Sequence, residues 1–437
     1  MARLLYTLLL VLLLPLVIIW MKWRGWRNPA HRGSLRQRLA IGLQQRQDHP
    51  LWLHAASVGE VQALVGLVRL LLREAPAQPL LITVGSPTGV TRAEALFAQE
   101  VQTHPGEAQR VTVLLAPFDF PGVARRFLAA IGPRSGAFVE TEIWPNMIAV
   151  ATRCGVPLSM VSARVSERST SSYLRYAPGL VRRTLVKFRS IGAQSEADRQ
   201  RFIRLGADPS RVQVIGNLKF DFPLPVDIEQ QGQKLRARYA PHRPMWVAGS
   251  THTGEEEICI AAQQVLLDRA SAAGNALPLL VLAPRRAERF DEVANWLAWR
   301  GIRFVRSSTT NSTPGGEHTA ADVVLVDTLG ELLAFYAASD VAFVGGSLVP
   351  VGGHNLLEPA ALGKPTLTGP HSFNSPEAAR LLEQAQALSR VTDATLADAI
   401  HKLLSDPVAA AAQGQRAAAA VVANQGAAAR ALQMIAG

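Results

Sequence analysis

The feature that most constrains this chain is an apolar stretch without a charged residue, residues 4–21. As an α-helix it would be about 27 Å long, near the lower limit for crossing a bilayer. Pro15 lies inside it and is expected to kink it. The stretch is followed by a basic collar of Lys22, Arg24, Arg27, Arg32, Arg36, Arg38 and Arg46, and the first acid is Asp48. These cations supply most of the net charge of +11, which favours anionic partners.

A secretory signal peptide is the alternative interpretation of this segment. The order of charges is inverted relative to a signal peptide, and no small-residue cleavage site follows. Trp20, Trp23 and Trp26 lie among the cations, as is typical of a membrane interface. Positive charge after the stretch keeps the remaining chain in the cytoplasm. The sequence therefore predicts a membrane anchor with part of its collar at 1–27, and a body held against anionic lipid.

From about residue 50, short apolar runs alternate with helix-like segments, which predicts βαβ units and parallel sheets. Apolar residues make up 48% of the chain, enough for large buried cores. The proline-rich and charged segment 220–244 is expected to link two lobes. The expected strands are 51–54, 80–84, 111–115, 136–140, 157–161 and 212–215, then 245–248, 279–283, 302–305, 323–326, 340–344 and a last one near 365–368.

The predicted fold class is therefore α/β, with two Rossmann-like doubly wound lobes in addition to the anchor helix. The lobes are expected at 28–222 and 223–437, and the alanine-rich tail 408–437 favours helix. Ligands of such folds bind beyond the carboxyl ends of the strands. We therefore expect the site in an interlobe cleft.

Several chemistries lack their signatures in this sequence. It contains no GxxxxGK[ST], GxGxxG, HExxH, CxxC or GxSxG motif, which removes the main support for P-loop, dinucleotide, zincin and serine-hydrolase sites. Cys154 and Cys259 are too few for a disulfide framework or a cysteine metal site. No cluster has metal-ligand spacing, so we expect no metal cofactor. Outside the anchor, cations and aromatics are not interleaved, which argues against nucleic-acid binding.

The motif 54–60 follows the first expected strand and opens a helix with Glu60. Stabilisation by the helix dipole is a sufficient structural explanation for this acid. The functional interpretation is a general base at the strand end, which the dipole keeps ionised at neutral pH. Gly59 would let a substrate approach the backbone.

The motif 140–146 places Glu140 and Glu142 directly after another expected strand. The two acids share a face if the stretch is extended. Alternatively, they lie at the start of a helix that has Pro145 in its first turn. Acids so close together at a strand end seldom serve packing, so we favour function for them and packing for Trp144.

Cations and glycines follow the later strands. Lys219, which follows a strand and a glycine, is either surface or a cation for a leaving phosphate. Arg285 and Arg286 follow another strand and suit bidentate phosphate binding. In the motif 249–256, Thr253 and Glu256 fit a capping box, which leaves the loop 249–252 as a ligand contact.

The glycine-rich segment 345–359 is the last candidate. A glycine-rich loop that opens a helix offers free backbone N–H groups to an anion. Asn355 and Glu358 fit a helix cap. Alternatively, Glu358 would hold a pair of ribose hydroxyls, and so much glycine beside an acid favours function.

Together and in this order, these motifs resemble those of the 3-deoxy-D-manno-octulosonic acid (Kdo) transferases of lipopolysaccharide synthesis. The resemblance covers the whole chain, including the anchor. It is carried by Ser-Val-Gly-Glu at 57–60, Glu-Thr-Glu-Ile-Trp-Pro-Asn at 140–146, Ser-Thr-His-Thr-Gly-Glu-Glu at 250–256 and Gly-Gly-His-Asn-Leu-Leu-Glu at 352–358. The last motif alone is typical only of two-lobed GT-B glycosyltransferases. Pro359, where relatives often carry Ala, is a small departure.

The resemblance implies transfer of Kdo from CMP-Kdo to the 6′-hydroxyl of a tetra-acylated lipid A precursor (lipid IVA), at the inner membrane and without a metal. It implies that Glu60 is the proton acceptor and that Glu140 and Lys219 stabilise the transition state. The residues that it places against CMP are Pro284, Arg285, Leu329, Gly330, Glu331, Asn355, Leu356, Leu357 and Glu358. Further candidates for the lipid phosphates, or else a solvated basic face, are Arg164, Arg168, Arg175, Arg182 and Arg183.

Two rival interpretations stay open. One is a GT-B transferase or nucleotide-sugar epimerase that uses a UDP donor, for which CMP would compete poorly. The other is a membrane-tethered, anion-binding scaffold without catalysis. The number of Kdo units added, the acyl pattern accepted, the oligomeric state and whether the anchor spans the bilayer are not given by the sequence.

Overall fold

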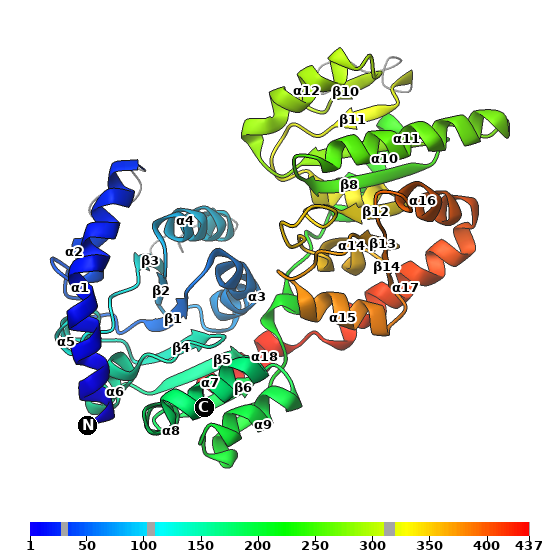
Figure 1. Cartoon of the computed structure of the whole chain (residues 1–437). Helices are drawn as coiled ribbons and strands as arrows, with labels where there is room; N and C mark the ends of the chain where they lie inside the picture. Colours follow the sequence, from blue (N-terminus) through cyan, green and yellow to red (C-terminus); the bar gives the residue numbers. More distant parts are fainter. Residues whose placement is uncertain (28–33, 103–109, 310–319, 437) are drawn as a thin grey trace. The chain divides into compact units, whose positions relative to one another are not determined.

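The computed structural model describes residues 1–27, 34–102, 110–309 and 320–436, which form two compact units (Figure 1). Unit 1 comprises Met1–Pro223 together with Asn424–Gly437, and unit 2 comprises Leu224–Ala423. Of the predicted basic collar, Arg32 lies outside the described residues. The sequence places the end of the chain in the second lobe, whereas residues from Asn424 onward belong to unit 1.

Unit 1 is built on a seven-stranded sheet in which every strand pair is parallel, in the order β3-β2-β1-β4-β5-β6-β7. The chain therefore builds one half of the sheet outward from β1 and then returns to β4 at its other side. This reversal between β1 and β4 is the point at which doubly wound folds bind ligands. The strands are β1 (Leu51–Ala55), β2 (Leu80–Val84), β3 (Val111–Leu115), β4 (Ser135–Val139), β5 (Leu158–Ala163), β6 (Ser190–Ala193) and β7 (Val212–Val214).

Helices cover both faces of this sheet, because neighbouring residues of a buried strand point to opposite sides. Trp52 of β1 packs into a core with α5, α6, α8 and α9, whereas Leu51 and Leu53 pack into a second core with α3, α4 and α18. The helices of unit 1 are α1 (Ala2–Arg27), α2 (Ser34–Arg38), α3 (Val58–Glu74), α4 (Pro87–Gln102), α5 (Pro121–Ile131), α6 (Pro145–Arg153), α7 (Glu167–Tyr176), α8 (Pro178–Leu185), α9 (Glu196–Arg204), the short η2 (Pro209–Arg211) and η3 (Leu218–Asp221), and α18 (Ala427–Ala436).

Unit 2 repeats this plan with a second parallel sheet of seven strands, in the order β10-β11-β9-β8-β12-β13-β14. Its reversal lies between β8 and β12. The two sheets confirm the predicted pair of Rossmann-like lobes. The strands are β8 (Met245–Thr251), β9 (Leu279–Pro284), β10 (Phe304–Arg306), β11 (Val323–Leu325), β12 (Val341–Val344), β13 (Thr366–Thr368) and β14 (Leu388–Arg390).

One face of the second sheet packs against α11, α12 and α16 in a core that contains Trp246 and Phe343. On other helices of the unit, the rings of Tyr239 and Phe335 lie 5.9 Å apart and join α10 to α13. The helices of unit 2 are α10 (Ile228–Tyr239), α11 (Glu255–Ala272), the short η4 (Ala287–Arg289), α12 (Phe290–Trp299), α13 (Leu332–Ala338), α14 (Leu357–Ala361), α15 (Pro376–Gln384), α16 (Leu396–Ser405) and α17 (Pro407–Ala423).

Three elements differ from the sequence prediction. The strands β6 and β14 were not predicted, because both are short and neither is a continuous apolar run. The predicted linker 220–244 contains the helix α10. This helix was not predicted because most of its residues are polar, and only one of its faces packs on α13. The remaining strands lie within a few residues of their expected positions.

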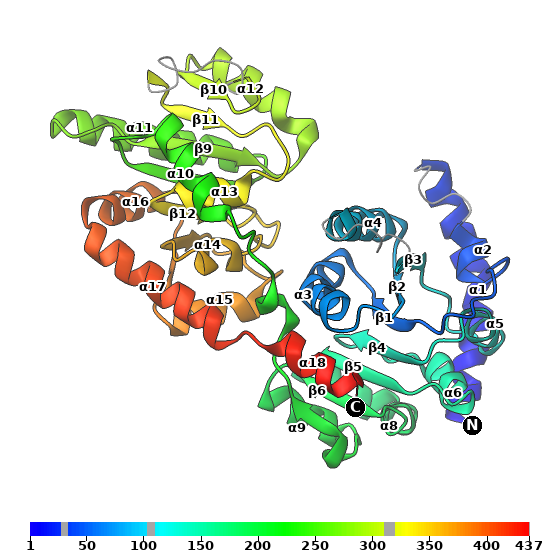
Figure 2. The same cartoon turned by 180° about the vertical axis from the view of Figure 1, so that it is seen from behind.

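The C-terminal helix α18 returns to unit 1, where it packs against α3, β5 and β6 (Figure 2). Asp221, at the end of η3, fixes the start of this helix. Its carboxylate accepts hydrogen bonds from the backbone N–H groups of Gly426, at 2.6 Å, and Ala428, at 2.5 Å. Two segments about 200 residues apart in the chain are thereby joined by an N-terminal cap of the helix.

We expect Asp221→Ala to lower the free energy of unfolding by about 2 kcal/mol, because the two N–H groups lose their acceptor. Amide hydrogen exchange should become faster over 424–436 in particular. Asp227→Ala, at the exposed start of α10, is the matched control. Equal losses of stability for the two variants, with no faster exchange in α18, would contradict this role.

Candidate functional site

Three carboxylates gather at the reversal of the first sheet. Glu60 follows β1, and Glu140 and Glu142 follow β4, the strand beside it. The negative charges of Glu140 and Glu142 act on Glu60 and disfavour its ionisation, so the three groups share one electrostatic environment. The structure therefore brings together the two acidic motifs that the sequence singled out, although they are about 80 residues apart.

Glu60 is held in place by the turn that joins β1 to α3. Ser57 caps the helix by accepting a hydrogen bond from the Glu60 N–H, at 3.3 Å. The Glu60 carboxylate in turn accepts from the Ser57 hydroxyl, at 2.9 Å, and from the Ala56 N–H, at 2.7 Å. This arrangement is close to a capping box. The residue as a whole is 9% exposed, and these hydrogen bonds fix the orientation of its carboxylate before any substrate binds.

Burial raises the pKa of Glu60 to about 7, against the opposing effect of the Ala56 and Ser57 hydrogen bonds. The carboxyl is therefore only partly ionised at neutral pH, whereas the helix dipole alone led us to expect a fully ionised acid. Desolvation outweighs the favourable electrostatics of the helix start. A pKa near the working pH is what a general base needs, because the group can both take up and release a proton. At Gly59, an added Cβ would meet only Ser57 Oγ, at 3.8 Å, which leaves this side of the turn open.

Glu140 forms an ion pair with Lys219, which approaches from η3 beyond β7. The Lys219 Nζ donates to Glu140 Oε1 at 2.7 Å, and both side chains are partly exposed. Glu140 has a φ of 58°, a left-handed conformation that is rare for a residue with a Cβ. Backbone strain of this kind is typical of functional sites.

Glu142 belongs to a second, more buried cluster. Its Oε2 accepts a hydrogen bond from Trp144 Nε1 at 2.6 Å and lies 3.5 Å from His54 Nε2. The ring of His54 is fully buried, and its Nδ1 lies 2.9 Å from the Thr83 hydroxyl. Trp52 Nε1 donates to the same hydroxyl, at 2.8 Å, so Thr83 links the rings of Trp52 and His54.

Neither expectation for the geometry of the motif 140–146 is met. The left-handed turn at Glu140 sends the two acids to different partners, so they do not share an extended face. Helix α6 begins at Pro145 with Trp144 as its N-cap, so no acid lies in its first turn. Trp144 packs against the rings of His54 and Phe138 and also orients Glu142.

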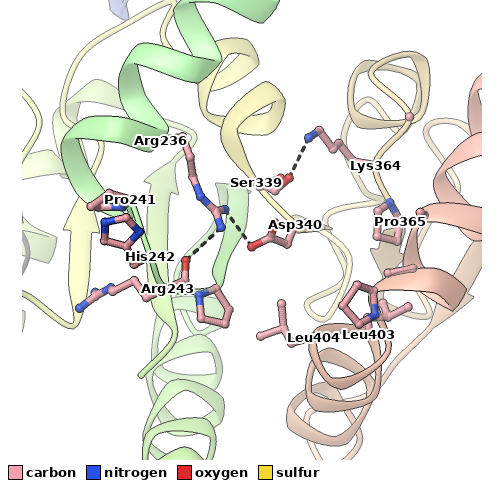
Figure 3. A pocket seen from close by; sticks show the side chains of 15 residues that line it. Arg236, Pro241, His242, Arg243, Ser339, Asp340, Lys364, Pro365, Leu403 and Leu404 are labelled. Atoms are coloured by element: carbon pink, nitrogen blue, oxygen red, sulfur yellow. Dashed lines mark hydrogen bonds and ion pairs between the residues drawn. The ribbon is translucent and has the colours of Figure 1, made fainter. Parts of the chain in front are cut away.

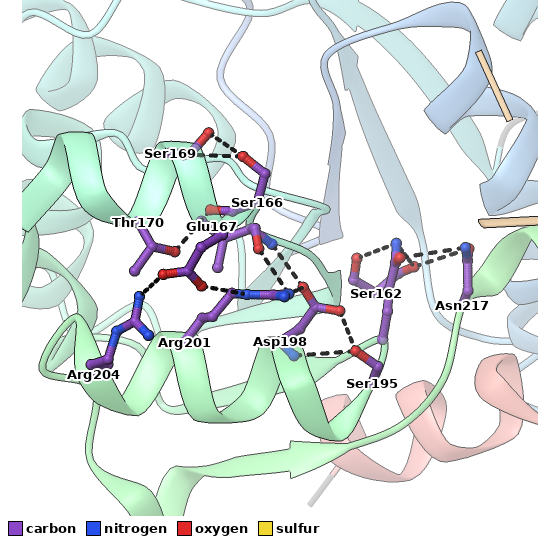
Figure 4. Close-up of polar contacts among 12 residues, drawn as sticks. Ser162, Ser166, Glu167, Ser169, Thr170, Ser195, Asp198, Arg201, Arg204 and Asn217 are labelled. Atoms are coloured by element: carbon purple, nitrogen blue, oxygen red, sulfur yellow. Dashed lines mark hydrogen bonds and ion pairs between the residues drawn. The ribbon is translucent and has the colours of Figure 1, made fainter. Parts of the chain in front are cut away.

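A buried hydrogen-bond network, of which Figure 4 shows Ser162 and Asn217, holds the backbone next to Lys219. Ser162, whose φ of 52° lies at an irregularity inside β5, accepts at Oγ from the Leu218 N–H, at 3.2 Å, and from Gln194 Nε2, also at 3.2 Å. Asn217 caps η3 by accepting from the Lys219 N–H at 3.0 Å, and its own amide lies 3.4 Å from Gln194 Oε1. Sequence analysis missed Ser162 and Gln194, because isolated polar residues at strand ends carry no motif.

The five arginines that were candidates for lipid phosphates are all exposed, and four of them lie on α7 and α8. The arginines of α9 are different, since they hold this part of the unit together (Figure 4). Arg201 pairs with Asp198 and Glu167, both at 3.3 Å, and Arg204 pairs with Glu167. The α9 cations are therefore structural, whereas those of α7 and α8 are available to an anion.

At the reversal of the second sheet, a carboxylate of this chain binds residues 346–348 of the predicted anion-binding segment 345–359. Glu255 is fully buried, and its Oε1 accepts from the N–H groups of Ser347 and Leu348, both at 2.9 Å. Its Oε2 accepts from the N–H groups of Gly346, at 2.6 Å, and His252, at 3.0 Å. The glycine-rich loop after β12 therefore binds an acid of this chain, and these N–H groups are not free for a ligand.

One expectation for the loop after β8 needs correction. Thr253 and Glu256 form no capping box, because Gly254, with a φ of 93°, is the N-cap of α11. Glu256 instead accepts from the Thr251 hydroxyl at 3.0 Å and pairs with Arg289 at 2.6 Å.

His252 and His354 join the loops after β8 and β12. Their rings are stacked, 5° from parallel, with the two Nε2 atoms 2.8 Å apart, so one nitrogen donates and the other accepts. Burial and the charge of Arg285 lower the pKa of His354 to about 4. Burial also lowers the pKa of His252. Both rings are therefore neutral at pH 7.

The residues that the resemblance places against CMP follow three strands of the second sheet. Arg285 is exposed after β9, where its charge acts on both His354 and Glu358. Asn355 donates to Glu358 Oε1 at 3.1 Å and accepts from the Leu357 N–H at 3.1 Å, but the N-cap of α14 is Leu356 and not, as the sequence had suggested, Asn355. Burial raises the pKa of Glu358. The remaining residues of this set lie in the same loops. Pro284 is the last residue of β9, Leu356 directly precedes α14, and Leu329, Gly330 and Glu331 directly precede α13.

A cavity of about 500 Å³ in unit 2 lies elsewhere (Figure 3). Its walls come from segments that precede β8, β12 and β13, so it opens at the amino ends of the strands, opposite the reversal site. Its cations already have partners within the wall. Arg236 pairs with Asp340 at 2.8 Å, and Lys364 donates to the Ser339 carbonyl at 2.8 Å. Among the described residues, no group of three or more His, Cys, Asp or Glu is arranged to hold a metal ion.

The sequence is similar to known proteins over its whole length. The family described as 3-deoxy-D-manno-octulosonic-acid transferase (kdotransferase) matches residues 33–222. The 3-deoxy-D-manno-octulosonic acid transferase of Bordetella pertussis is 38% identical over 448 residues, which cover 100% of this chain and 99% of that protein. The protein of the same name from Haemophilus influenzae is 34% identical, with 99% of this chain and 98% of that protein covered.

Solved structures resemble this chain in fold. The UDP-GlcNAc 2-epimerase of Neisseria meningitidis has a TM-score of 0.57 at 13% identity, covering 89% of this chain and 99% of that one. A glycosyltransferase from Rickettsia africae has a TM-score of 0.52 at 12% identity, covering 89% and 98%. At such low identity these likenesses concern the fold alone. They agree with two Rossmann-like units of the GT-B type.

We expect the stability of the wild type relative to Glu60→Gln to fall as the pH rises from 5 to 8. The folded carboxyl has a pKa of about 7 and the unfolded one about 4.5, so over this range the folded state binds the extra proton and loses it with rising pH. The difference in unfolding free energy should decrease by about 2 kcal/mol. Denaturant titration at several pH values measures it. Glu74→Gln, at the exposed end of the same helix, should show no such trend.

Glu255→Gln should lower the free energy of unfolding by about 3 kcal/mol, because an amide NH₂ would face backbone N–H donors in a buried site. Glu257→Gln, on the exposed side of the same helix turn, should change it by less than about 0.5 kcal/mol. Urea denaturation of both variants tests this. Similar values for the two would mean that Glu255 does not hold the glycine-rich loop.

Proposed function

Because this chain belongs to the 3-deoxy-D-manno-octulosonic acid (Kdo) transferases, the glycosyltransferases that add Kdo during lipopolysaccharide synthesis, we propose that it takes Kdo from CMP-Kdo. The proposed acceptor is the 6′-hydroxyl of a tetra-acylated lipid A precursor, lipid IVA. The observation that carries the proposal is the meeting of Glu60 with the Glu140–Lys219 ion pair at the reversal of the first sheet.

In the proposed step, an acceptor hydroxyl attacks the anomeric carbon of Kdo. The O–H bond breaks and its proton passes to the Glu60 carboxylate, while a new C–O bond forms to the sugar. The bond from the anomeric carbon to the phosphate breaks, and CMP leaves with the electron pair. The Ala56 N–H and the Ser57 hydroxyl fix the Glu60 oxygens, so the base needs no reorganisation when the hydroxyl arrives.

Glu140 and Lys219 are proposed to stabilise the transition state. Positive charge develops on the sugar ring as the phosphate bond breaks, and a carboxylate held nearby stabilises it. The ammonium of Lys219 offers the opposite charge to the departing phosphate. Their contact at 2.7 Å keeps both charges in one place, and the Ser162–Gln194–Asn217 network fixes the backbone that carries Lys219.

Unit 2 is proposed to bind the donor nucleotide through the residues at its strand ends. Arg285 is exposed and suits the phosphate. Glu358, beside Asn355, suits the ribose hydroxyls. Because the glycine-rich loop is occupied by Glu255, we assign phosphate recognition to side chains and not to that loop. No metal takes part in the proposed reaction.

The acceptor is a phosphorylated lipid, and the proposal places the protein on the cytoplasmic face of the inner membrane. The helix α1 is long and apolar enough to lie in or across a membrane. Exposed cations of the collar and of α7 and α8 would contact anionic lipid and the phosphates of the acceptor. The transferase has no nucleic-acid partner in this proposal.

The test is transfer from CMP-Kdo, generated in situ, to lipid IVA in detergent micelles, with and without EDTA. We expect wild-type product in both conditions and a loss of at least about 100-fold in kcat for Glu60→Gln, because general-base catalysis typically contributes this much. Glu74→Gln is the control.

Two results would overturn the proposal. If the wild type gives no product and CMP does not raise its melting temperature, while UDP does, the donor is a UDP sugar. If Glu60→Gln keeps full activity, another group is the base. If EDTA abolishes product formation by the wild type, the reaction needs a metal, and only the metal-independent part of the proposal is overturned.

A further inference from the structure

The helix α1 lies along one side of unit 1 (Figure 1). Its contacts are with α6 and α8. On one side of the helix, residues are half-buried at a spacing of three to four, and this stripe ends at Gly25, which is buried. The stripe consists of Thr7, Leu10, Leu14, Val17, Ile18, Met21 and Gly25. Such spacing is that of a helix packed lengthwise on a protein surface.

Polar contacts fix the first turns of α1 to the body. The Tyr6 hydroxyl donates to Asp119 Oδ2 at 3.0 Å, and Thr7 Oγ1 lies 3.1 Å from Asn146 Oδ1. Asp119 also accepts from the N–H groups of Asn146, at 3.1 Å, and Met147, at 2.6 Å. The same carboxylate therefore caps α6 and binds the anchor helix.

These contacts are incompatible with a helix that crosses the bilayer. From Tyr6 to the end of α1 the helix rises about 30 Å, which is the thickness of the hydrocarbon core of a membrane. The chain enters the folded body soon after this end, at α2. In a crossing helix, Tyr6 would be a full bilayer thickness away from the body and could not reach Asp119.

The opposite side of α1 is apolar and exposed from Leu4 to Trp26; Leu12, for example, is 74% exposed and Trp26 is 77% exposed. Exposed charges lie only toward the two ends, Arg3 at one and Lys22 and Arg24 at the other. A helix with cations at both ends and an apolar outer face matches a leaflet, where the charges reach the headgroups. Acyl chains are the occupant that this face fits.

We propose that α1 is docked lengthwise on unit 1 and lies within one leaflet of the membrane, with its outer face among the acyl chains, and does not cross to the other side. This inference rests on the proposed membrane attachment and is independent of the donor and the acceptor. The docking also reaches the candidate site. Asp119 caps α6, which begins directly after Trp144, so the anchor supports the loop that carries Glu140 and Glu142.

The location of the helix start tests the proposal. In a Cys154→Ser background, Ala2→Cys is treated with a membrane-impermeant maleimide in spheroplasts and after the membrane has been opened. We expect labelling only after opening. A second sample, the unaltered chain, reports the side on which the body lies, because its Cys154 is exposed. Cys259 is buried and should not react. Labelling of Ala2→Cys in intact spheroplasts, with Cys154 protected, would overturn the proposal.

A cross-link tests the docking itself, in membranes from the same cells. Thr7→Cys paired with Asn146→Cys should be joined by a short bismaleimide, seen as a shift in gel mobility. Leu12→Cys paired with Asn146→Cys is the matched control, because Leu12 points away from the body. No cross-link in the first pair, or equal cross-linking in both, would overturn the docking. Transfer activity is measured separately, so failure of the proposed function would not be confused with failure of this inference.

Discussion

In each unit a carboxylate lies where the sheet reverses, and hydrogen-bond donors of the turn hold it there. Glu255 receives four backbone N–H groups, so the loops after β8 and β12 close around it. Glu60 receives one backbone N–H and one hydroxyl, in a site that also contains two other acids. The two carboxyl groups are placed alike but differ in role. Glu255 holds the loops of unit 2 together, whereas Glu60 in unit 1 has a pKa that is raised to about 7.

The rest of the first site depends on residues that bring Lys219 and Glu142 to this point. Glu140, after β4, and Ser162, at an irregularity inside β5, both adopt left-handed conformations, and both side chains bind residues of the segment 217–219. Ser162 fixes the start of η3 before Lys219, and buried His54 lies against Glu142. The strain at these positions is offset by hydrogen bonds from neighbouring strands. The site is therefore built from the same contacts that pack the loops at the carboxyl ends of the strands.

The anchor helix has a similar relation to the body. Hydropathy identifies an apolar segment and predicts contact with lipid, but it gives the same result for a crossing helix and for one that lies in a leaflet. The contacts of Tyr6 and Thr7 with Asp119 and Asn146 distinguish the two. They also connect lipid attachment to the loop before α6, because the half-buried carboxylate of Asp119 binds both the anchor helix and the start of α6.

The sequence by itself determined the two parallel sheets, most of their strands, the apolar anchor and the motifs at the strand ends, because these depend on local periodicity and on the order of short segments. It also carried the family resemblance. Only the tertiary structure decided which groups meet: Lys219 with Glu140, Glu255 with the glycine-rich loop, and α18 with unit 1. The pKa of Glu60 was likewise beyond local reasoning, since the dipole is a property of one helix, whereas desolvation depends on everything packed around the carboxyl.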